Sequence, residues 1–266
     1  MRLLLVSVLF ASILTTPGWA QDHSAPLAID VTIPPYVRTL EGTAVDTGGF
    51  SAGMSYDALR ELAEKTYGAD TFREMEGDLS MSLKGVRVVT ADYVQLVYHN
   101  AKEFTARFTG PSGGPQTYLV DRAVQHEDIM TAPNRELMLD ALTEKYGEPS
   151  TANQLPRGMA LAWAFKDGIQ VPCVMHGMTG PGPRCWVDDR GVSGRDAIKQ
   201  VTDFDFLIHV VARSFRADSD KIQSYNVTIV DYKLRAETSA ADTAALEAAT
   251  EALLAASQGE MAKPSL

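Results

Sequence analysis

The sequence ALRELAEKTYG, residues 58–68, is followed later in the chain by the similar sequence LDALTEKYG, residues 139–147. In both stretches apolar residues recur at helical spacing, and a glycine follows the tyrosine, as is common where a helix ends. Ser55 can cap the first helix, and Pro133 stands near the start of the second. The similarity, with one extra residue before the first Tyr-Gly pair, favours two units of one plan over a single doubly wound sheet.

Short runs rich in β-branched and aromatic residues follow each of these helices. The runs after the first helix span 83–90, 93–99, 103–110 and 117–125, and those after the second span 159–165, 169–175, 184–187, 203–213 and 223–234. Because no crossover helices separate them, their sheets should be antiparallel. A third helix is predicted over 240–256. The expected fold class is therefore α+β: tandem units of a helix followed by a small antiparallel sheet, with a C-terminal helix.

The predicted elements divide the chain into five parts. Residues 21–50, rich in proline, glycine and threonine, are expected to form an irregular arm. The full division is a signal peptide (1–20), the irregular arm (21–50), a first α+β unit (51–130), a second α+β unit with the C-terminal helix (131–257) and a frayed tail (258–266).

The N-terminus has the three parts of a secretory signal peptide. Arg2 supplies a positive start, residues 3–14 form an apolar run, and small residues precede a cleavage position after Ala20. The apolar run is shorter than the about 20 residues that a membrane-spanning helix needs, so no transmembrane segment is expected. A buried N-terminal helix is the alternative, and Pro17-Gly18 disfavours it. No lipid anchor is expected, since the first cysteine is Cys173. The protein should therefore be periplasmic or secreted.

Acidic residues outnumber basic ones by 34 to 24, which gives a formal net charge of −10. A protein of this sign does not attract nucleic acid or anionic membranes by bulk charge, so nucleic acid is not an expected partner.

The chain contains two cysteines, Cys173 and Cys185, which flank the turn-forming sequence 180–183. In an oxidising compartment an even number of cysteines predicts a disulfide, here with the two residues on neighbouring strands. A metal or catalytic thiol involving His176 is the alternative, although one histidine and two cysteines make an incomplete ligand set. We expect a disulfide, no metal site and no cofactor.

Residues 49–53 fit the pattern G-x-S-x-G, which places Ser51 where a hydrolase nucleophile could stand. Such a nucleophile follows a buried strand, whereas the preceding residues 43–48 are short and polar. The simpler interpretation is a glycine-rich entry to the first helix.

Gly53-Met54-Ser55, at the start of a short helix that ends in Tyr67-Gly68, resembles the start of the SmpA/OmlA-like outer-membrane-assembly lipoproteins. Secreted β-lactamase inhibitor proteins contain a tandem of a similar unit. Residues 121–122, together with the later run 142–149, resemble a family of uncharacterised exported proteobacterial proteins. These resemblances imply a binding or structural module and supply no catalytic residues.

The sequence thus predicts a non-enzymatic periplasmic or secreted module that binds another protein or envelope component through a sheet face. A patterned, acidic chain without converging catalytic or metal-binding motifs supports this hypothesis. The alternative function is an envelope serine hydrolase that uses Ser51. An exposed aromatic cluster on one sheet face would mark the partner surface.

Overall fold

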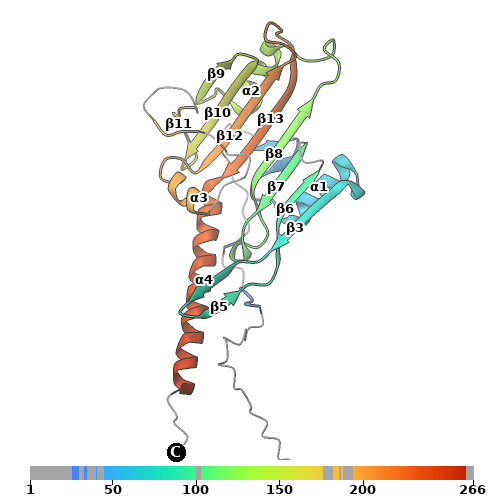
Figure 1. Ribbon diagram of the computed structural model, residues 1–266. Coiled ribbons are helices and arrows are strands. Elements are labelled where there is room, and N and C mark those ends of the chain that lie inside the picture. Colours follow the sequence, from blue (N-terminus) through green and yellow to red (C-terminus); the bar gives the residue numbers. More distant parts are fainter. Residues whose placement is uncertain are drawn as a thin grey trace, which may run out of the picture.

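The strands from both halves of the chain form one antiparallel sheet of nine strands (Figure 1). The computed structural model describes residues 26–29, 33–34, 40, 45–99, 103–175, 182–185, 187 and 194–261. The sheet has the order β11-β10-β12-β13-β8-β7-β6-β3, and β9 also pairs with β10. Its strands are β3 (Phe72–Gly77), β6 (Tyr93–His99), β7 (Phe104–Phe108), β8 (Thr117–Gln125), β9 (Thr151–Leu155), β10 (Gly158–Lys166), β11 (Ile169–Val171), β12 (Phe206–Ser214) and β13 (Ile222–Asp231).

The expected tandem of helix–sheet units is wrong, because β8 and β13 join their strands into a single sheet in a mainly β structure. Their antiparallel pairing runs from Leu119 opposite Val230 to Gln125 opposite Ser224. In two separate units, β8 and β13 would each be a long edge strand with unpaired backbone groups. Their pairing satisfies those groups, and it also places Val120 beside Ile229 on a buried face.

The two helices predicted from the repeated sequence are confirmed. They are α1 (Tyr56–Tyr67) and α2 (Arg135–Tyr146). Ser55 caps α1 by accepting a hydrogen bond from the Ala58 amide. Pro133 does stand near the start of α2, and the next residue, Asn134, caps that helix by accepting a hydrogen bond from the Leu137 amide. Each helix ends at a glycine with positive φ, Gly68 or Gly147, which a residue with a side chain would adopt only at a cost.

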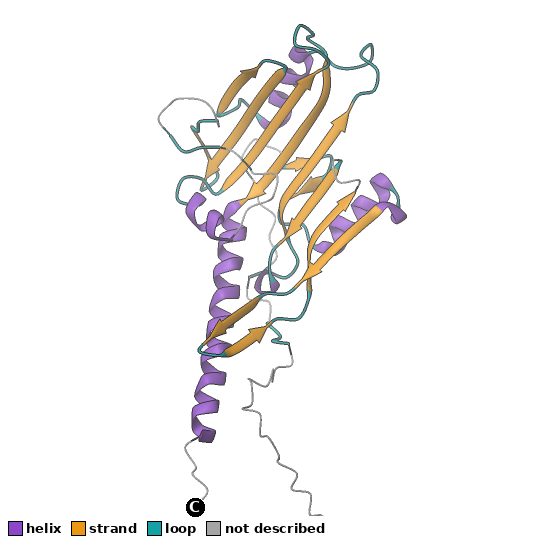
Figure 2. Ribbon diagram, viewed as in Figure 1, coloured by secondary structure: helices purple, strands orange, loops and turns teal. Residues whose placement is uncertain are grey.

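Both helices cover the same face of the sheet and lie behind it in Figure 2. Leu59 and Ala63 of α1 pack with the buried residues of β6, β7 and β8. Met138, Leu142 and Tyr146 of α2 pack with the buried residues of β10, β12 and β13, among them Trp163.

The last helix, α4 (Tyr232–Met261), starts and ends beyond the predicted 240–256. It follows β13 directly, and the Asp231 side chain accepts a hydrogen bond from the Leu234 amide at 2.8 Å. Its first turns, together with α3 (Gly194–Gln200), cover the other face of the sheet near β10, β12 and β13. Residues 258–261 of the expected tail are helical, and 262–266 lie outside the described residues.

Several short elements differ from the sequence-based expectation. The predicted strand 83–90 is a hairpin of β4 (Ser80–Leu83) and β5 (Val86–Val89), which turns at Lys84-Gly85, both at positive φ. Strands β3 and β9 were not predicted, because their side chains are mostly polar. Within the expected arm, β1 (Asp46–Thr47) pairs with β2 (Phe50–Ser51), and Leu27 forms a bridge with Thr90. The 3-10 helices are η1 (Ala69–Thr71) and η2 (Pro111–Gly113).

The predicted disulfide is confirmed: Cys173 and Cys185 are bonded, with their Cα atoms 5.5 Å apart. Their surroundings differ from the expectation of two neighbouring strands. Predicted strand 169–175 ends at Val171. Among the described residues of the predicted strand 184–187, Arg184 forms an isolated bridge with Val174 and no longer strand is present. His176, which belonged to the metal alternative, lies outside the described residues, as does the predicted signal peptide.

None of the helices in the described part of the chain is both long and apolar enough to cross a membrane.

Candidate functional site: an open face of the sheet

In the described part of the chain, one half of the sheet has a helix on one face only. Cross-strand partners point to the same side of a sheet, so the register defines both faces. Beneath α1 lies a row formed by Glu74, Val97, Ala106 and Val120. The opposite side carries two rows, and in Figures 1 and 2 no helix lies in front of it. We call this side the open face and define it by the residues Arg73, Met75, Leu96, Tyr98, Thr105 and Arg107.

The open face combines apolar, aromatic and basic side chains. In one row Arg73 lies beside Tyr98 and Tyr98 beside Thr105, and in the next Met75 lies beside Leu96 and Leu96 beside Arg107. Met75 is 53% exposed, whereas Leu96, Tyr98, Thr105 and Arg107 are half-buried. These side chains are thus accessible from solvent without being fully solvated.

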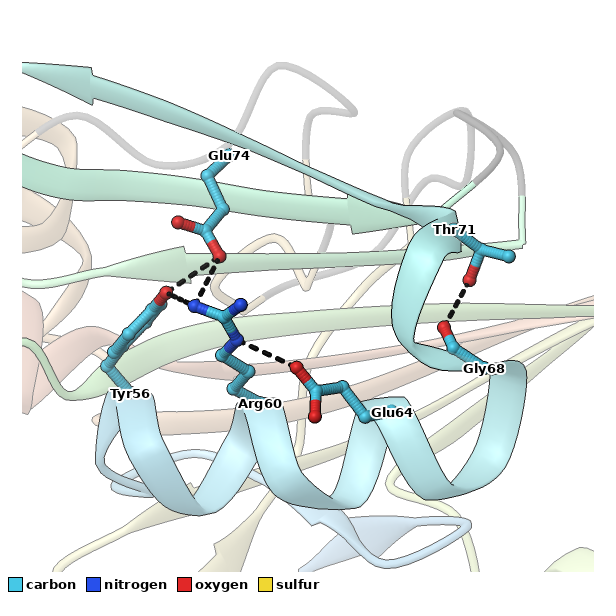
Figure 3. A network of polar contacts seen from close by, with 6 residues as sticks. All are labelled: Tyr56, Arg60, Glu64, Gly68, Thr71 and Glu74. Carbon is cyan, nitrogen blue, oxygen red and sulfur yellow. Dashed lines mark hydrogen bonds and ion pairs between the residues drawn. The ribbon is translucent and has the colours of Figure 1, made fainter.

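A polar cluster on the other face anchors β3 to α1 (Figure 3). The Tyr56 hydroxyl donates a hydrogen bond to Glu74 Oε1 at 2.7 Å and accepts one from Arg60 Nη1 at 2.9 Å. Arg60 Nε also contacts Glu64 at 2.9 Å. Partial burial, and then the bond to Glu74, raise the pKa of Tyr56. Because Glu74 is held against the helix, its neighbours Arg73 and Met75 are directed to the open face.

The row of the open face that contains Arg73, Tyr98 and Thr105 is called the polar row. Towards the centre of the sheet it continues through Asp121 and Thr228 to His209. The Asp121 carboxylate accepts hydrogen bonds from Thr228 Oγ1 at 2.8 Å and from Asn226 Nδ2 at 3.1 Å. His209 is 8% exposed, and its burial lowers its pKa to about 4. The acidic group of this row is therefore engaged within the sheet.

Whereas Asp121 has hydrogen-bond partners within the sheet, Arg107 has a donor without one. Its Nε is buried and has no hydrogen-bond partner among the described residues. Its cross-strand neighbours, Leu96 and Leu119, are both apolar. A guanidinium stays protonated under all ordinary conditions, so this buried donor carries charge without an acceptor.

Ser51 lies elsewhere, in the hairpin of β1 and β2 beside α1. Its side chain is largely buried, its amide contacts Met54 Sδ at 3.3 Å, and its carbonyl accepts a hydrogen bond from Thr117 Oγ1 at 2.8 Å. Within the described residues, no hydrogen bond joins the Ser51 hydroxyl to a histidine or a carboxylate. The hydrolase alternative stays a prediction.

Three or more histidine, cysteine or acidic side chains do not gather into a possible metal site anywhere in the described part of the chain. No protein-family model, curated protein or solved structure matches the chain. The resemblance to exported envelope modules therefore stays a prediction.

The sequence suggested that an exposed aromatic cluster would mark the partner surface, but its local patterns do not identify the residues of the open face. Trp163 is fully buried, and Tyr98 is the aromatic residue of the open face. Alternation in 93–99 separates Leu96 and Tyr98 from Val97, but it does not tell which side a helix covers. Only the packing of α1 distinguishes the two sides.

Proposed function

We propose that the protein is a non-enzymatic periplasmic or secreted module that binds another protein through the open face. The observation that carries this proposal is the asymmetry of β3, β6 and β7. One side of these strands is covered by α1, and the other presents half-buried Tyr98, Leu96 and Arg107 beside exposed Met75. Tyrosine, methionine and arginine are enriched at protein interfaces.

Two further observations support a location outside the cytoplasm. The Cys173–Cys185 disulfide is typical of oxidising compartments. The N-terminal sequence, which lies outside the described residues, has the pattern of a signal peptide.

The test identifies the partner and then locates the contact. A photo-crosslinking amino acid is placed at position 75 in one sample and at position 169 in another, and crosslinked partners from envelope extract are identified by mass spectrometry. Ile169 is a matched control, because it is 71% exposed and lies on β11 at the far end of the sheet. We expect one protein to crosslink from position 75 and not from position 169.

Calorimetry with the purified partner then compares the wild type with Met75→Asp and Ile169→Asp. We expect Met75→Asp to weaken binding at least tenfold and Ile169→Asp to leave it within twofold, because only the first places a charge in the contact. Equal crosslinking from both positions, or equal affinity of both variants, would refute the proposal.

A further inference from the structure

We infer that the open face recognises an acidic segment of its protein partner, with Arg107 and Arg73 as the groups that bind carboxylates. This inference rests on the proposed function and specifies the chemistry of the partner.

Arg107 is the first reason. Leaving a buried donor without an acceptor destabilises a protein, and more so when the group is charged. Arg107 lies in the middle of the sheet between apolar neighbours, where a β-branched residue would suit the strand better. Within the described residues, the Nε donor of this guanidinium forms no hydrogen bond with the fold. A ligand that supplies the missing acceptor would explain it.

The chemistry of the guanidinium limits which groups of a ligand it can bind. Its planar set of donors matches the two oxygens of a carboxylate or phosphate. Arg73, exposed on β3, adds a second positive charge to the same face, on the far side of Tyr98. The nearest acidic group of the polar row, Asp121, is engaged by Thr228 and Asn226. The open face is therefore locally basic on a protein with a net charge of −10.

The surroundings favour a protein carboxylate over a polyanionic surface. Met75 and Leu96 lie within the same face, so the ligand must offer apolar groups next to its negative charge. The acidic protein as a whole would be repelled by a nucleic acid or an anionic membrane. A short segment with aspartate or glutamate beside apolar residues fits both the charge and the apolar area.

The geometry also favours binding on the face rather than pairing with the edge strand β3. The register of β3 shifts between Met75 and Glu76, and both Glu74 and Glu76 stand on this short strand. Bulges and charged residues are devices that keep edge strands from pairing with other chains. A partner segment that lies across β6 and β7 avoids both the bulge and the glutamates of β3.

The experiment uses a blocked pentapeptide in which glutamate alternates with leucine, a matched peptide with glutamine in place of glutamate, and inorganic phosphate. Side-chain NMR follows the Arg107 Nε–H resonance of the wild type, so this readout needs no substitution. We expect the glutamate peptide to shift this resonance and to bind at least tenfold more tightly than the glutamine peptide. Arg107→Gln should weaken binding at least tenfold, with Arg107→Lys intermediate. Arg213→Gln, which removes an exposed arginine at the far end of β12, should leave affinity within twofold.

Several outcomes would overturn the inference. They are an unshifted Arg107 resonance at millimolar peptide, equal losses from Arg107→Gln and Arg213→Gln, and phosphate binding that matches the glutamate peptide. If these occur while Met75→Asp still weakens binding to the crosslinked partner at least tenfold, the open face binds by other chemistry and only the acidic segment is refuted. If position 75 also fails to crosslink, the proposed function fails as well.

Discussion

The contact between α4 and the loop 110–114 is the place where a single substitution tests how the long helix is attached to the sheet. Asp242 of α4 is 3% exposed, and its Oδ1 accepts a hydrogen bond from the Ser112 amide at 2.8 Å. Hydrogen bonds to charged groups contribute about 1.5–3 kcal/mol. We therefore expect Asp242→Ala to lower the free energy of unfolding by about 2–3 kcal/mol.

Gly110 faces the same carboxyl group. A Cβ atom there would overlap Asp242 Oδ2 and lie 2.7 Å from Asp242 Cγ. Its backbone, with φ of −74°, would accept alanine without strain. The three atoms nearest to such a Cβ all belong to Asp242, so the cost of Gly110→Ala, about 1–3 kcal/mol for overpacking, should arise mainly from Asp242. When Asp242 is already alanine, the new methyl group enters the space left by the carboxyl group, and Gly110→Ala should cost little.

Urea denaturation followed by circular dichroism of the wild type, both single variants and the double variant measures this coupling. We expect the double variant to be about as stable as Asp242→Ala. Asp242→Asn serves as the control, because it keeps the shape of the side chain and should retain the clash with Gly110→Ala. If the two single-variant costs add to the double-variant cost within about 0.5 kcal/mol, Gly110 and Asp242 are not coupled, since contacting residues should not behave independently.

Three further predictions concern stability and activity. Cys173→Ala removes the disulfide between residues 12 apart in sequence and should lower the free energy of unfolding by about 2–4 kcal/mol, because the unfolded chain is then less restricted. Urea denaturation under non-reducing conditions measures the loss, and an unchanged midpoint would contradict a structural role of the disulfide. Burial holds the pKa of His209 at about 4 in the folded protein against about 6.5 unfolded, so the unfolded state binds the proton first as pH falls. The contribution of His209 to the free energy of unfolding should therefore be complete above pH 6.5 and fall by about 3 kcal/mol as the pH is lowered to 4. In a pH series of urea denaturation midpoints, His209→Gln should flatten the decline over this range. A decline of the same slope in the variant would show that His209 is not its cause. Hydrolysis of p-nitrophenyl acetate should be the same for the wild type and Ser51→Ala, and turnover that this substitution abolishes would favour the hydrolase alternative.

The elements with strong local signals were predictable from the sequence. Ser55 and Gly68 delimit α1 because capping and positive φ depend on single residues and their near neighbours. The predicted strands 93–99 and 117–125 coincide with β6 and β8, whose residues favour strands. The disulfide followed from the presence of two cysteines and the expected compartment. By contrast, the polar strand β3 carries no such signal.

The way in which these elements combine depends on long-range contacts. The pairing of β8 with β13 joins residues as far apart in sequence as Asp121 and Thr228, and local propensity says nothing about which distant edges meet. The same holds for the open face. Alternation along β7 puts the side chains of Arg107 and Ala106 on opposite faces of the sheet. The packing of α1 decides that Ala106 is buried and that Arg107 lies on the side that α1 does not cover. Local sequence signals therefore suffice for α1, α2, most of α4, most of the strands and the disulfide. Long-range side-chain packing sets the single sheet and its open face.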